Sequence, residues 1–191
     1  MLKSSRRVLA LLAATVAVGG LATASAQAAV LHVNGERTAI TANAGSVGFF
    51  SAFGITVTPT GPASTGTDGS LILPITHGFV TTEGPPKAKI YHSGGVTFSL
   101  GDRSLNFRDF VLVHKKDRTW LKALLNDRGW VIFAWVNPVS VTYASSTEAT
   151  VTGELKLSEQ AAHAFDFLVG SNVSVAGTEI AKLKSTVRVV G

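Results

Sequence analysis

The densest group of side chains able to do chemistry is the segment Tyr91-His92-Ser93-Gly94-Gly95. A phenol, an imidazole and a hydroxyl follow one another there, and histidine readily serves as a base or as a metal or haem ligand near neutral pH. The two glycines allow a ligand or another stretch of backbone to approach closely. The segment is therefore either a binding site formed by Tyr91, His92 and Ser93, or the start of a strand next to an ordinary turn.

Aromatic residues form a second group of candidates. Trp120 and Trp130 lie on the two halves of a predicted hairpin, where they form either an exposed platform for a ligand or part of the core. Phe50 and Phe53 are three residues apart in a predicted helix, which places them on one face of it. These four side chains are candidates for contact with an apolar ligand.

The sequence contains no specific catalytic motif. No Gly-x-Ser-x-Gly element is present, and Ser93 lacks the strand-turn-helix context that such a nucleophile needs. The five histidines show no H-x-H or H-x-x-x-H spacing, and the absence of cysteine excludes a thiolate metal site and a disulfide. Asp102 and Asp109 stand beside Arg103 and Arg108, which is typical of salt-bridged turns. We therefore assign no catalytic residue and no metal ligand, and expect a protein that is not an enzyme.

The first 28 residues have the layout of a secretory signal peptide. Lys3, Arg6 and Arg7 form a positive start, residues 8–22 form an apolar run, and Ala26-Gln27-Ala28 is a typical cleavage sequence. The paired arginines fit either the general secretory or the twin-arginine route. We expect residues 29–191 to form one exported domain with no transmembrane segment after cleavage.

Charge argues against a nucleic-acid partner. The chain has 17 basic and 12 acidic residues, and three of the basic residues lie in the predicted signal peptide. What remains is close to neutral, and no basic block alternates with aromatic residues as single-strand binding surfaces require.

The rest of the chain reads as strands. Alternating apolar residues over 88–113 predict two strands that fold back at Gly101-Asp102-Arg103, with a bulge after Asp109. A second hairpin is predicted over 120–136, and Asn34-Gly35 predicts a third.

Two short helices are predicted near the ends of the chain. One covers about residues 42–53, with Thr41 or Asn43 as its cap, and the other covers about 159–168, with Ser158 as its cap. Each ends at a glycine and leads into a strand, so the two regions resemble one strand-helix-strand unit used twice. We predict a single antiparallel β-sandwich of about ten strands on which the two helices pack.

The run from His92 to Phe98, together with residues 105–113, resembles the core of small secreted actinobacterial β-sandwich proteins. It is also similar to the HtaA-type domains of haem uptake, in which a His-Gly element precedes a strand pair. In that family a tyrosine on the first helix holds the haem iron, assisted by the histidine of the His-Gly element. The comparable helix here offers Phe49, Phe50 and Phe53 and no tyrosine. The resemblance therefore implies the fold, while of the haem ligands only His92 carries over.

These observations lead to three functional hypotheses. The first is a secreted, non-catalytic binding or structural module at the bacterial cell envelope, whose partner is an envelope component or a small apolar ligand. The second is a protein that binds or transfers haem or another apolar small molecule through His92. The third is an envelope hydrolase, which requires His92, Ser93 and a carboxylate to converge in a cavity.

Overall fold

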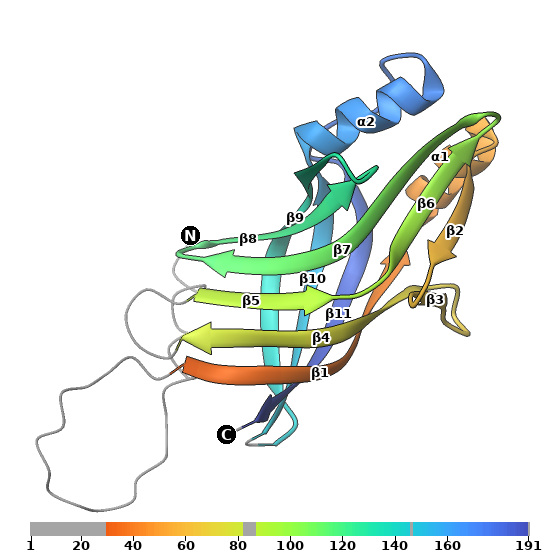
Figure 1. Cartoon of the computed structure of the whole chain (residues 1–191). Coiled ribbons are helices and arrows are strands. Elements are labelled where there is room, and N and C mark those ends of the chain that lie inside the picture. The colour runs from red at the N-terminus through yellow and green to blue at the C-terminus, as the bar shows by residue number, and fades with distance from the viewer. Residues whose placement is uncertain (1–29, 82–86, 146, 191) are drawn as a thin grey trace, which may run out of the picture.

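The computed structural model describes residues 30–81, 87–145 and 147–190, so the predicted signal peptide lies outside the described residues. Two helices and eleven strands occur within these ranges (Figure 1). The helices are α1 (Ala44–Phe53) and α2 (Glu159–Val169). The strands are β1 (Val30–Ala42), β2 (Thr56–Thr60), β3 (Ser64–Thr65), β4 (Leu71–Thr81), β5 (Lys87–His92), β6 (Gly95–Leu100), β7 (Arg103–Lys115), β8 (Arg118–Leu125), β9 (Gly129–Tyr143), β10 (Glu148–Leu157) and β11 (Glu179–Val190).

Eight of the strands close into a barrel. Their order is β7-β5-β4-β1-β11-β10-β9-β8, and β8 returns to pair with β7. The prediction of a mainly β fold with two short helices is confirmed, but the predicted sandwich has to be corrected to a closed barrel with additional strands. Strands of sandwiches and barrels share the same alternation of buried and exposed residues, so the pattern does not distinguish the two.

The sheet branches at β7. Along one edge of β7 lie β6, which pairs with residues 103–108, and β5, which pairs with residues 111–115, while β8 lies along the other edge. A bulge separates the two halves, with Asp109 at a φ of 53°. Strands β6 and β2 extend the sheet beyond the barrel (Figure 1). The predicted turn at Gly101-Asp102-Arg103 and the bulge after Asp109 are therefore confirmed, but the first of the two predicted strands is divided into β5 and β6.

Two glycines at the start of β6, Gly94 just before it and Gly95 as its first residue, allow backbone segments to pack closely. A Cβ on Gly95 would lie 2.1 Å from the carbonyl oxygen of Phe107, and one on Gly94 would lie 2.3 Å from the nitrogen of Ala63. Gly94 also has a φ of 77°, a conformation that other residues adopt only rarely. The sequence allows either a ligand or another stretch of backbone beside these glycines, and in the structure backbone lies there.

The hairpin predicted at Asn34-Gly35 is wrong. β1 continues through both residues, because β11 pairs with one edge of it and β4 with the other. Gly35 lies instead at an irregularity of the β1–β11 register, and a Cβ there would lie 2.5 Å from the side chain of Ile75. Gly35 thus allows the side chain of Ile75 to pack directly against the backbone of β1, and it does not form a turn.

Both helices lie at the same end of the barrel, and the topology explains why. β1 and β10 are each antiparallel to β11, so they run in the same direction and their carboxyl ends meet at one end (Figure 1). The helices that follow begin with side-chain caps: Asn43 accepts from the backbone N–H of Ser46 (2.8 Å), and Ser158 from that of Ala161 (3.0 Å). The two similar units of the sequence therefore come together in space.

Candidate functional site

A cavity of about 400 Å³ lies between α1, α2 and the end of the barrel. Its volume falls within the usual range of small-molecule sites. Residues from both helices, from β6 and β7, and from the segment 173–181 form its walls. The cavity therefore lies where the two strand-helix-strand units meet.

Phenylalanine rings dominate the cavity wall. Six of them line it: Phe49, Phe50, Phe98, Phe110, Phe133 and Phe165. The ring centroids of Phe50 and Phe98 are 5.3 Å apart, and those of Phe98 and Phe165 are 4.9 Å apart, distances at which aromatic pairs attract. The rings thus form a continuous apolar surface from α1 across β6 to α2.

Few polar groups face this cavity. Ser46 lines it, but its hydroxyl already donates to the carbonyl oxygen of Ile180 at 2.8 Å. Ser174 and Thr178 contribute two further hydroxyl-bearing side chains. Among the described residues that line the cavity, only Glu179 is charged.

His92 lies behind the cavity wall rather than in it. The side chain is buried, and its Nδ1 lies 2.9 Å from the carbonyl oxygen of Phe110. Its Nε2 lies 2.7 Å from the hydroxyl of Thr38, which is hydrogen bonded in turn to Ser185 at 2.8 Å. Because a carbonyl oxygen only accepts, the neutral ring carries its proton on Nδ1 and donates it to Phe110.

Burial keeps the imidazole of His92 neutral. Removal from water lowers its pKa from 6.5 to about 4, and the hydrogen bond to Phe110 offsets this only in part. Within the described part of the chain no carboxylate contacts the ring, since Thr38 and Phe110 are its partners. The arrangement that an envelope hydrolase would need around His92 and Ser93 is therefore not formed.

The other residues predicted for the site are dispersed. Tyr91 stacks on His77 with their ring centroids 4.4 Å apart, and the backbone N–H of Ser93 donates to Pro74 at 3.0 Å. Phe50 lines the cavity, whereas Phe53 packs on Phe49 at the exposed end of α1. The structure thus brings one of these residues, Phe50, to the cavity.

The two candidate tryptophans lie along the β8–β9 pair. Trp120 faces Trp135 across the strands, with ring centroids 6.1 Å apart. Trp130 pairs instead with Leu124, is half exposed, and has the ammonium nitrogen of Lys122 4.4 Å from its ring centroid. Neither lines the cavity.

Several cavity residues were not among the sequence candidates, notably Phe98, Phe110, Phe133, Phe165 and Glu179. The phenylalanines alternate within strands or follow the apolar stripe of a helix, as core residues do. They lie within β6, β7, β9 and α2, and that they surround one space is visible only once the strand order is known.

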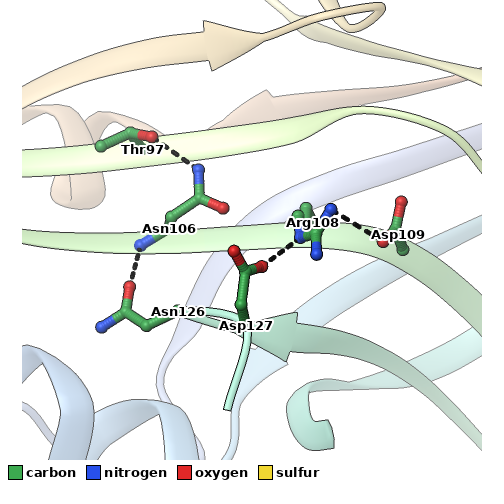
Figure 2. A network of polar contacts seen from close by, with 6 residues as sticks. All are labelled: Thr97, Asn106, Arg108, Asp109, Asn126 and Asp127. Atoms are coloured by element: carbon green, nitrogen blue, oxygen red, sulfur yellow. Dashed lines mark hydrogen bonds and ion pairs between the residues drawn. The ribbon is translucent and has the colours of Figure 1, made fainter. Parts of the chain in front are cut away.

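A separate network of polar side chains holds the branch point of the sheet (Figure 2). Arg108 forms ion pairs with Asp109, at 3.7 Å, and with Asp127 in the β8–β9 turn. Asn106 links two neighbouring segments: its backbone N–H donates to Asn126 (2.7 Å) and its side chain donates to Thr97 (2.8 Å). The predicted salt bridge between Arg108 and Asp109 is thus present, but it lies at the bulge within β7 rather than in a turn.

The described residues contain no group of three or more acidic or histidine side chains placed to hold a metal ion. Neither helix in that same part of the chain has the length and apolar character required to cross a bilayer.

Comparison with solved structures relates this geometry to known domains. The C-terminal domain of HtaA from Corynebacterium glutamicum superposes with a TM-score of 0.65, covering 84% of this chain and 99% of that domain at 16% sequence identity. The fold is that of an HtaA domain. The N-terminal domain of HtaA gives a TM-score of 0.51 at 11% identity, with 83% and 99% coverage, and a domain-swapped dimer of a C-terminal domain variant gives 0.53 at 14%, with 91% and 100% coverage.

The similarity to HtaA lies in the fold rather than in the sequence. The chain matches no protein-family model, and no curated protein matches it in sequence. The resemblance to HtaA-type domains, read from short segments around His92, is nevertheless confirmed at the level of the fold.

Proposed function

We propose that this chain is a non-catalytic binding protein that holds a small apolar molecule in the cavity between α1, α2 and the barrel. The observation that carries the proposal is the cavity wall, in which six phenylalanines and several aliphatic residues surround about 400 Å³ of space. Apolar walls with a few polar groups are typical of small-molecule sites. The HtaA-type fold supports this proposal, because the family it resembles serves in haem uptake.

The exposure of α1 also supports the proposal. This helix, with the sequence AGSVGFFSAF, has no charged residue, and none of its residues is buried. Helices that are apolar on all sides are normally buried. A ligand in the cavity would cover Phe49 and Phe50, which now face it half-buried. Each square ångström of apolar surface so covered stabilises the complex by about 25 cal/mol before the costs of association.

Haem is the ligand that the family resemblance suggests, but the residues of the cavity do not fit it. Protein side chains hold haem iron through histidine, tyrosine, cysteine or methionine. None of these occurs among the described residues that line the cavity, and His92 has both ring nitrogens in hydrogen bonds. The proposal is therefore a carrier for an apolar small molecule, without an assigned role for iron.

A fluorescence titration with phenylnaphthylamine, an uncharged apolar probe, tests the proposal. We expect saturable binding of one probe per chain with a Kd on the order of 10 μM. Bound probe stabilises the folded state, so the Tm should rise with probe concentration. A fluorescence increase that fails to saturate, or a Tm that stays constant, would contradict the proposal.

The cellular location of the protein is a second part of the proposal. The export signal of the sequence leads us to propose that the protein works outside the cytoplasm, at the cell envelope, where its ligand or an envelope component reaches it. Expression of the full chain in a bacterial host should release a form whose N-terminus, determined by mass spectrometry, lies near Ala29. A product that keeps Met1 and remains in the cytoplasmic fraction would contradict this part.

A further inference from the structure

We infer that the cavity selects an apolar molecule that contains no metal and whose polar end is uncharged or cationic, rather than haem or another anion. This inference rests on the proposed function and names the ligand class for the same cavity. Two features of the cavity wall carry it: the absence of iron ligands, and the sign of the one charge among its described residues.

The first feature is the helix that would supply an iron ligand. On α1, the side chains that reach the cavity are Ser46, Phe49 and Phe50. Phenylalanine has no lone pair to give to a metal, and Ser46 already donates to Ile180. Across the cavity, α2 contributes Phe165. A porphyrin without iron would meet the same rings as haem does, so the metal would add nothing to its binding.

The second feature is the charge of Glu179. It is the one charged residue among the described residues of the cavity wall, and no lysine or arginine accompanies it there. Lys156 is its register partner on β10, but the two form no ion pair. A ligand carboxylate or sulfonate would therefore enter a largely apolar space beside a like charge, which is unfavourable on both counts.

Two probes with the same ring system test the inference. Phenylnaphthylamine is uncharged, and anilinonaphthalene sulfonate carries in addition one sulfonate. With the wild-type protein we expect the uncharged probe to bind at least about tenfold more tightly, which corresponds to about 1.4 kcal/mol. Equal affinities would overturn the inference and leave the proposed function intact, while absence of binding by either probe would overturn the proposed function itself.

The variant Glu179→Gln tests whether this carboxylate is the cause. It should reduce the ratio of the two affinities at least threefold, whereas Glu154→Gln, which removes the same charge from β10 outside the cavity wall, should leave the ratio unchanged. An unchanged ratio in Glu179→Gln, or an equal change in both variants, would contradict the role of Glu179. Circular dichroism confirms that each variant is folded.

A comparison of haemin with metal-free protoporphyrin tests the part of the inference that concerns iron. We expect haemin to bind no more tightly than the metal-free porphyrin and to show no shifted Soret band at one equivalent. A shifted band at one equivalent, together with tighter binding of haemin, would overturn the inference in favour of an iron ligand.

Discussion

His92 and the cavity are joined through a single residue, Phe110. Nδ1 of His92 lies 2.9 Å from the carbonyl oxygen of Phe110, while the ring of Phe110 forms part of the cavity wall. The histidine therefore supports the wall from behind. Its role in this account is to satisfy buried polar groups inside the barrel, and it is not expected to contact the ligand.

This placement predicts a pH dependence of stability. The pKa of His92 falls from 6.5 in the unfolded chain to about 4 in the folded one, so between these values the unfolded state binds a proton that the folded state does not. Stability is accordingly highest above pH 6.5 and decreases as the pH falls toward 4. From pH 7 to pH 4.5 the loss from this group is about 2 kcal/mol, measured by urea denaturation.

The variant His92→Gln isolates that contribution. It should be less stable than the wild type at pH 7 by about 1–3 kcal/mol, because its amide satisfies Thr38 and Phe110 less well. Its loss of stability between pH 7 and 4.5 should be smaller than that of the wild type by about 2 kcal/mol. His114, whose pKa burial also lowers, is present in both proteins and cancels in the comparison. Identical pH profiles would contradict the buried neutral imidazole.

Gly95 should be intolerant of any side chain. A Cβ at this position would lie 2.1 Å from the carbonyl oxygen of Phe107, so Gly95→Ala has to push β6 away from β7. We expect a loss of at least about 3 kcal/mol, the range of severe packing defects. Gly129→Ala is the matched control, since nothing lies within 4 Å of the added methyl group, and it should change stability by less than about 1 kcal/mol. Similar losses in both variants would contradict the close strand contact.

The start of α2 depends on Ser158. Its hydroxyl accepts from the N–H of Ala161 and donates to the carbonyl oxygen of Ile132, so it caps the helix and ties it to β9. Ser158→Ala should lower the free energy of unfolding by about 1–2 kcal/mol. Ser171→Ala, at an exposed position beyond the end of α2, is the control and should have little effect. A Ser158→Ala variant as stable as the control would show that the cap is not needed.

Features set by neighbouring residues could be predicted from the sequence. The caps at Asn43 and Ser158 and the strand pair around Gly101 depend on residues a few positions apart, and all three are present. The hairpin at Asn34-Gly35 failed because β1 has a pairing partner on each edge, which overrides the local turn preference. Local signals therefore identified the elements, while closure of the barrel depended on the long-range pairing of β1 with β11.

The site was less predictable, because its parts are distant in the chain. His92 is 54 residues from its partner Thr38, and Thr38 is 147 residues from Ser185. The cavity unites Phe50 with Phe98 and Phe165, which in sequence look like ordinary core residues. Only the parallel course of β1 and β10, which places both helices at one end, brings them together. The sequence therefore indicated candidate aromatic residues, but which of them line the cavity depends on the three-dimensional arrangement of the strands and helices.

The most direct test of the central claim is to fill the cavity from α1. Gly45 lines it and has room for a side chain, since the nearest atom to an added Cβ is 3.5 Å away, whereas Gly48 lies on the same helix outside the cavity wall. Titration with phenylnaphthylamine should show at least about tenfold weaker binding for Gly45→Phe and a change of less than about twofold for Gly48→Phe. Wild-type affinity in Gly45→Phe, or equal weakening in both variants, would contradict a ligand site in this cavity.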